Sequence, residues 1–241
     1  ELLRLPRWWR HGVRGGWALL PVHARVVLVT TAGFLVAGAA AFLVLEWGRS
    51  LAPLSLPARL LAAAFQSVTL RTAGFATVDL ARLGAPMALL CLVLMFVGGS
   101  PGGTAGGVKT TTVAVLALTF RAMLRNRADV EAFGRSIPPA NVYRAAAVAL
   151  VSFGLLFGLA FLLVLLEPDQ PFLPLMFEAV SAFGTVGLSL DLTPSLSPGG
   201  QVVVCALMFV GRLGPFTLAL AAGLSRDRAA YSYPSTKIMV G

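Results

Sequence analysis

Two glycine-containing tetrapeptides carry the residue types that could coordinate an alkali cation through the main chain. They are Thr72-Ala73-Gly74-Phe75 and Thr185-Val186-Gly187-Leu188. Glycine adopts backbone dihedral angles that are closed to other residues, so consecutive carbonyl oxygens can turn toward one axis and replace the hydration shell of potassium. A short helix before such a turn also directs the negative end of its dipole at the cation. One tetrapeptide is a weak motif, but two in the same context are persuasive.

A glycine-rich stretch, residues 98–109, is the second candidate for chemistry. Residues 102–107 followed by Lys109 approach the Gly-x4-Gly-Lys-Thr pattern of a phosphate-binding loop. Val108 disrupts that spacing and the preceding segment is an apolar span rather than a strand, so we do not expect a nucleotide here. A stretch this rich in glycine cannot hold a regular helix. We expect the helix to break at Gly98 and to resume near Thr110, with a plain kink as the alternative.

Arg212 is the third candidate, because it is a single charge near the middle of the apolar run 202–224. A charge at the centre of a bilayer costs about 2.5 to 3.5 kcal/mol and usually faces a water-filled cavity. A structural arginine that donates hydrogen bonds to loop carbonyls is the other interpretation, and the two roles are compatible.

The elements that must position these residues follow from composition. Of the 241 residues 57% are hydrophobic and 12% are charged, whereas soluble domains carry about 25% charged residues, so we expect a membrane protein. The apolar runs long enough to span a bilayer are residues 26–45, 145–166, 202–224 and 86–120, the last interrupted by the glycine-rich stretch. Residues 57–70 and 172–183 are too short to span and are typical of re-entrant half-helices. The predicted fold class is an all-α membrane protein.

An internal duplication relates the two halves. The run Leu-Met-Phe-Val-Gly occurs at residues 94–98 and again at residues 207–211, and the separation of the two copies equals that of Gly74 and Gly187. In this register Arg212 aligns with Gly99. The sequence therefore predicts two tandem repeats of span, short helix, Thr-x-Gly-x turn and span.

The net charge of +9 records orientation. Of the 19 lysines and arginines, 14 lie in residues 1–25, residues 109–144 or the C-terminal tail, and this side is predicted to be cytoplasmic. The opposite side holds both tetrapeptides and six of the ten acids: Glu46, Asp79, Glu167, Asp169, Glu178 and Asp191. These acids could form a cation-concentrating vestibule, or they could be ordinary solvated loop residues.

Longer motifs around these residues resemble the Trk/Ktr/HKT superfamily of potassium transporters, and most closely the membrane subunit of the bacterial Ktr system. They are SVTLRTAGF (67–75), GGSPGGTAGGVKTTT (98–112), SAFGTVGL (181–188) and the tail YPSTKIMVG (233–241). The resemblance covers nearly the whole chain. It implies four span, pore-helix, span repeats around one pore, of which this chain matches the third and fourth, so it would form half of a potassium-channel-like pore.

The resemblance also implies how the chain divides. The expected segments are a cytoplasmic basic interfacial segment (1–25), the third repeat (26–128) with an intramembrane loop (98–109), a cytoplasmic linker (129–144), the fourth repeat (145–228) and a C-terminal tail (229–241). Because the chain lacks an initiator Met and half of the filter, we expect a fragment of a longer chain rather than a natural half-length transporter.

By the same resemblance, backbone carbonyls of Thr72 to Phe75 and of Thr185 to Leu188 coordinate K⁺ in a selectivity filter. A gate lies beneath it, where a fixed positive charge raises the barrier for a cation. The gate residues are Gly98, Gly99, Gly102, Gly103, Gly106, Gly107, Lys109 and Arg212.

The expected function is potassium uptake across the plasma membrane, either passive or sodium-dependent, by a multi-pass protein without a cofactor. K⁺ would be the transported ion and Na⁺ a coupling ion, and the expected partners are the lipid bilayer, a second copy of the chain and a cytoplasmic nucleotide-binding regulatory ring, with no nucleic acid. A non-conducting membrane scaffold or assembly subunit is the alternative, because only half of the filter is present. An enzyme is not expected, since no predicted span carries the His, Asp or Glu that intramembrane catalysis requires.

Overall fold

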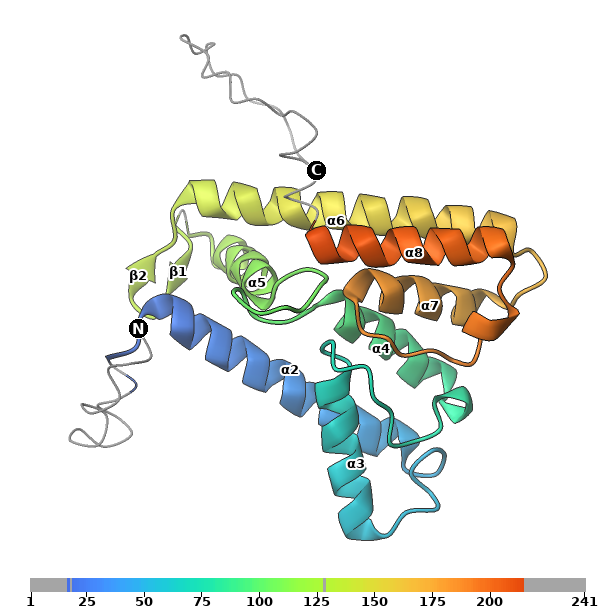
Figure 1. Ribbon diagram of the computed structural model, residues 1–241. Coiled ribbons are helices and arrows are strands. Elements are labelled where there is room, and N and C mark those ends of the chain that lie inside the picture. The colour runs from blue at the N-terminus through green and yellow to red at the C-terminus, as the bar shows by residue number, and fades with distance from the viewer. Residues whose placement is uncertain (1–16, 18, 128, 215–241) are drawn as a thin grey trace, which may run out of the picture.

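The computed structural model of the chain describes residue 17, residues 19–127 and residues 129–214, and it is predominantly helical (Figure 1). Its first half comprises α2 (Val22–Glu46), α3 (Leu56–Thr69), the 3-10 helix η2 (Leu80–Arg82), α4 (Ala85–Phe96) and α5 (Thr110–Leu124). Its second half comprises α6 (Pro139–Leu166), α7 (Phe172–Gly184), the 3-10 helix η3 (Thr193–Ser195) and α8 (Pro198–Leu213). A hairpin of β1 (Glu131–Ala132) and β2 (Arg135–Ser136) connects the halves.

Two of the described helices, α2 and α6, are long and apolar enough to cross a membrane. Helix α6 begins at Pro139, ahead of the predicted span and inside the segment expected to be a linker. The physical reason is Pro138-Pro139, because proline suits the first position of a helix and its fixed φ starts the helix there. The hairpin in the same linker was not predicted either; its two-residue turn, Phe133-Gly134, has positive φ at both residues.

The interruption between α4 and α5 lies where the glycine-rich stretch predicts it. Helix α4 ends at Phe96 and α5 begins at Thr110. The residues between them form a loop rather than a kink, since Val97 and Val108 pair as a parallel bridge at its base.

Helix α8 covers the described part of the span predicted over residues 202–224, and it ends within that range. It runs from Pro198 to Leu213, and Gly214 has a φ of 79°. Glycine adopts this conformation freely, and Pro215, next in the sequence, disfavours a helical residue before it. Arg212 therefore lies in the last turn of α8. Residues 215–241, with most of the predicted interfacial segment (1–16 and 18), lie outside the described part of the chain.

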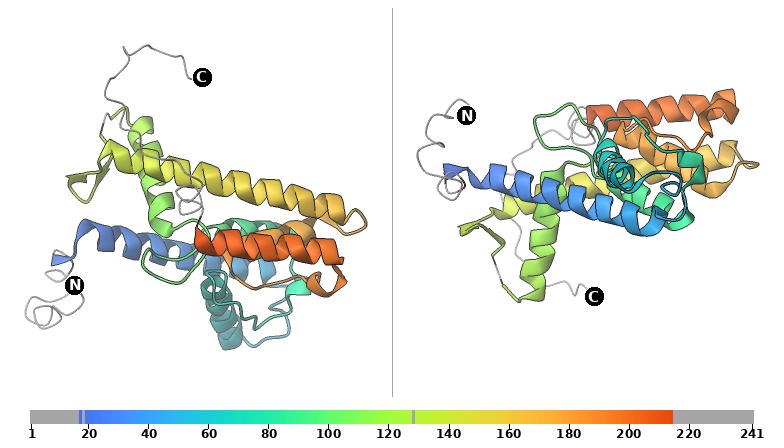
Figure 2. Two further views of the ribbon diagram at one scale, coloured as in Figure 1. Left: turned by 45° about the horizontal axis from the view of Figure 1, so that its top comes forward. Right: turned by 90° about the horizontal axis from the view of Figure 1, so that it is seen from below.

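The core surrounds α7, which packs against α4, α6 and α8. From Phe177 to its end every residue of α7 is buried, and Phe177 and Phe183 are fully enclosed. Helix α3 packs against α2 instead and projects away from the rest of the bundle (Figures 1 and 2). Its outer face leaves large apolar side chains exposed, among them Leu61 and Phe65.

Candidate functional site

The two tetrapeptides follow the ends of the short helices α3 and α7 and share one backbone pattern. In the first, Thr72 has a φ of 75° and Gly74 a φ of 80°. In the second, Thr185 has a φ of 52° and Gly187 a φ of 85°. The left-handed conformation at both glycines is the one that the sequence analysis expects, while the same conformation at both threonines was not foreseen. Alternating left-handed residues turn successive peptide groups, which a regular helix or strand cannot do.

These two turns come from opposite halves of the sequence, yet they lie against each other. A Cβ atom added to Gly74 would lie 2.6 Å from the carbonyl oxygen of Val186, whereas one added to Gly187 would lie 3.7 Å from the Cα atom of Gly74. Gly74 is thus the residue whose missing side chain lets the turns meet. The structure therefore brings the two predicted filter segments together.

Each turn is braced from behind by its own short helix. The Thr69 hydroxyl accepts a hydrogen bond from Phe75 N (2.9 Å) and donates one to Phe75 O (2.6 Å), which closes the first turn. In the second repeat Ala182 occupies the equivalent position and cannot do this. There a backbone hydrogen bond connects the turn to its helix, since Val186 N donates to Ser181 O at 2.9 Å.

A buried polar side chain on each short helix reaches the segment that leaves the turn. Gln66 Nε2 donates to the Thr77 hydroxyl (3.3 Å), and the Glu178 carboxylate accepts hydrogen bonds from the hydroxyls of Ser189 (2.7 Å) and Thr193 (2.6 Å). The sequence separation from Gln66 to Thr77 equals that from Glu178 to Ser189. Glu178 is 6% exposed, so it is neither a solvated loop acid nor a free vestibule charge.

Two further acids, Glu46 and Glu167, lie at the ends of α2 and α6 and are buried as well. Glu46 Oε1 accepts from Gly84 N at 2.9 Å, and Glu167 Oε1 accepts from Ser197 N at 2.8 Å. Gly84 and Ser197 are the N-cap residues of α4 and α8, and they occupy equivalent positions in the register of the two repeats. Each carboxylate thus accepts a hydrogen bond from a backbone N–H at the N-terminus of a helix, where negative charge is favourable. For Glu46, Glu167 and Glu178 the interpretation as solvated loop residues or free vestibule charges is wrong, whereas Asp79, Asp169 and Asp191 are exposed, as solvated loop acids are.

The glycine-rich loop packs against the second turn. Gly106 N donates to the Thr185 hydroxyl at 3.0 Å, and a Cβ atom on Gly106 would collide with that side chain at 2.5 Å. At the base of the loop Gly98 N donates to Val108 O (2.9 Å). Gly102 and Gly103, which were predicted with the others as gate residues, lie at the exposed tip of the loop, away from the turns.

Three basic side chains hold the loop by its carbonyl groups. Arg212 donates to Thr104 O and Lys109 Nζ donates to Ala105 O. Arg71 Nη2 donates to Gly98 O at 3.0 Å, and its guanidinium lies 5.6 Å from the centre of the Phe34 ring. The interpretation of Arg212 as an arginine bound to loop carbonyls is therefore correct. Sequence reasoning missed Arg71, although a basic residue directly before the first tetrapeptide was the available signal.

A cavity of about 450 Å³ lies on the second turn and joins these features. It is lined by Glu178, Ser181, Ala182, Thr185, Gly187, Leu188, Ser189, Thr193, Val204, Met208 and Arg212. Non-helical backbone inside an apolar helical bundle, beside a cavity that polar side chains partly line, is typical of membrane channels and transporters. The reason is that peptide groups at membrane depth must be satisfied by protein or water.

The chain belongs to the TrkH family of cation transport proteins, whose sequence profile matches residues 8–232. It is 38% identical over 228 residues to the potassium/sodium uptake protein NtpJ of Enterococcus hirae, covering 92% of this chain and 51% of that protein. It is 36% identical over 236 residues to the Ktr system potassium uptake protein B of Vibrio alginolyticus, covering 97% of this chain and 51% of that protein. The chain thus spans about half the length of these curated relatives. The resemblance seen in the motifs is confirmed.

A solved structure shows the same fold. The crystal structure of the potassium transporter TrkH from Vibrio parahaemolyticus matches with a TM-score of 0.60 at 24% identity, covering 85% of this chain and 44% of that one.

Proposed function

We propose that the chain forms part of a potassium uptake pathway across the cell membrane. The observation that carries the proposal is the contact between two left-handed turns, each at the C-terminal end of a short helix. Such helices direct negative dipole ends toward the turns, and backbone carbonyls then substitute for the water around a cation. The relatives named as potassium or potassium/sodium uptake proteins support potassium as the substrate.

The chain supplies two of four repeats in this proposal. The repeats are residues 26–128 and 145–228, and they are supported by the common register that relates the filter glycines and the capped N-termini of α4 and α8. The exposed apolar face of α3 supports further protein beside the first turn, whereas α7 is already enclosed. The other half of the filter comes from additional repeats or from a second chain.

The gate in this proposal is the loop 98–109 held by Arg212. The loop lies between the base of α4 and the Thr185 hydroxyl, and Arg212 borders the same cavity as Gly187. A guanidinium there opposes the passage of a cation. When the Arg212 guanidinium no longer binds Thr104 O, the loop loses that contact. Sodium dependence, a homodimer and a cytoplasmic regulatory subunit are the remaining parts of the proposal. The Ktr system relatives support the last of these.

Complementation tests the function. A bacterial strain without potassium uptake systems, supplied with the chain alone or with the chain joined to two further repeats of a relative, is grown at limiting potassium. Growth and rubidium uptake by the joined protein are expected, and their absence when that protein is folded in the membrane would contradict the proposal. Such an absence would favour a non-conducting scaffold.

A further inference from the structure

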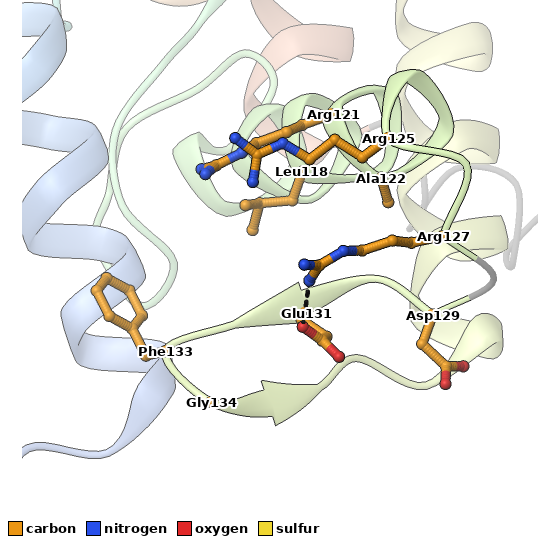
Figure 3. Close-up of a pocket in the computed structure, with 9 residues that line it drawn as sticks. All are labelled: Leu118, Arg121, Ala122, Arg125, Arg127, Asp129, Glu131, Phe133 and Gly134. Carbon is orange, nitrogen blue, oxygen red and sulfur yellow. Dashed lines mark hydrogen bonds and ion pairs between the residues drawn. The ribbon is translucent and has the colours of Figure 1, made fainter.

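A basic cavity lies at the end of α5 (Figure 3), and it shares no lining residue with the cavity on the second turn. Its volume is about 230 Å³, and it lies between the last turns of α5 and the β1–β2 hairpin. The charged residues that line it are Arg121, Arg125, Arg127, Asp129 and Glu131. Neither the filter nor the gate uses these residues.

Two of these arginines carry charge that the cavity does not neutralise. Arg127 pairs with Glu131 at 2.9 Å, and the Asp129 carboxylate points away from Arg121 and Arg125 (Figure 3). Arg121 lies in the last turn of α5 and Arg125 is its C-cap residue, four positions further along the chain. Within residues 19–127 and 129–214 neither forms an ion pair. Two adjacent guanidinium groups match a phosphate, which accepts several hydrogen bonds at once.

An apolar groove continues from this cavity between α2 and α5. It has a volume of about 560 Å³ and shares Leu118, Arg121, Glu131 and Phe133 with the basic cavity. Val26, Val29 and Phe34 line it on α2. From Val26 to Phe34 that helix rises about 12 Å. A ligand that fills both spaces needs an anionic head and an apolar tail.

The aromatic residues place this junction at the membrane surface. Phe133 at the tip of the hairpin is 45% exposed and contacts Trp17 with ring centres 6.4 Å apart. Aromatic side chains of this kind gather where hydrocarbon meets headgroups. The surrounding basic residues 109–144 mark this as the cytoplasmic side, whose leaflet is rich in anionic lipid.

We propose that this site binds an anionic phospholipid, with the phosphate on Arg121 and Arg125 and an acyl chain in the groove. A free anion would satisfy the arginines but leave the groove empty. An apolar chain alone would leave the arginines unpaired. The lipid would join α2, α5 and the hairpin at the cytoplasmic end of the first half of the chain.

Native mass spectrometry of the full chain, purified in a mild detergent and titrated with phosphatidylglycerol or phosphatidylcholine, tests the proposal. We expect retention of phosphatidylglycerol and little retention of phosphatidylcholine. The double variant Arg121→Gln/Arg125→Gln should bind phosphatidylglycerol roughly 25-fold more weakly, because each arginine contributes about a factor of five near an anionic surface. The matched control Arg82→Gln/Arg135→Gln removes two arginines that do not line the cavity and should bind as the parent does.

A second variant and a competitor separate the lipid from a free anion. Val29→Trp narrows the groove from α2, at a residue that does not line the basic cavity, and it should weaken phosphatidylglycerol binding while the protein keeps its elution volume. Inorganic phosphate at millimolar concentration should not displace the lipid. Displacement by phosphate, binding that Val29→Trp leaves unchanged, or equal losses in both arginine double variants would overturn the proposal.

Discussion

Alanine at Gly74 should damage the protein more than alanine at Gly187, although the two glycines occupy equivalent places. An alanine in the left-handed region costs roughly 1–2 kcal/mol at either position. At Gly74 the new Cβ atom also meets the backbone carbonyl of Val186 at 2.6 Å, and forced overpacking typically costs about 1–3 kcal/mol. At Gly187 the nearest atom is 3.7 Å away, an ordinary contact. The difference is thus about 1–3 kcal/mol, roughly 5- to 150-fold in an equilibrium.

Thermal unfolding of the purified variants measures this difference. In a chain of this size the extra cost should lower the unfolding midpoint of Gly74→Ala by roughly 2 to 12 °C relative to Gly187→Ala. Gly158→Ala is the matched control, because a Cβ atom there meets nothing within 4 Å in the interior of α6. Joined to a complete pore, both filter variants should lose preference for rubidium over sodium. A Gly187→Ala protein as unstable as Gly74→Ala would refute the reasoning about the contact.

Three further predictions follow from single side chains. Arg212→Ala removes the hydrogen bond to Thr104 O and the charge beside the cavity, so basal potassium uptake through the joined pore should rise severalfold; unchanged rate and gating would argue against the gate. Thr69→Val leaves both polar groups of Phe75 without their partner and should cost roughly 1–3 kcal/mol, measured by thermal unfolding. Glu167→Ala leaves the backbone N–H of Ser197 at the start of α8 without its partner and should also lower the free energy of unfolding by roughly 1–3 kcal/mol. Alanine at the exposed Asp169 should change the free energy of unfolding little.

The sequence predicts the order of the elements because each signal is local. An uncharged run long enough to span predicts α2, and the glycine-rich stretch ends α4 near Gly98 since glycine stabilises a helix poorly. The positive φ at Gly74 and Gly187 is equally local, because few other residues tolerate it.

Contacts between distant segments could not be predicted in the same way. Glu46 looks like a loop acid because it ends an apolar run, and only the position of Gly84, far along the sequence, turns it into a buried helix cap. The end of α8 was misjudged because hydropathy continues beyond Leu213, while the conformation of Gly214 ends the helix. Hydropathy measures average polarity and carries no information on a single dihedral angle.

The two halves of the chain share one φ pattern at their turns but hold these turns differently, and this difference bears on how the proposed gate would act on the proposed filter. The first turn is closed by Thr69 within its own segment. The second turn lacks that hydroxyl at Ala182, and the Thr185 side chain instead accepts a hydrogen bond from Gly106 of the loop. Because Arg71 of the first repeat and Arg212 of the second both hold the same loop, moving it breaks contacts with both halves. The second turn is therefore the one that a displaced loop would loosen first, while Thr69 keeps the first turn in place.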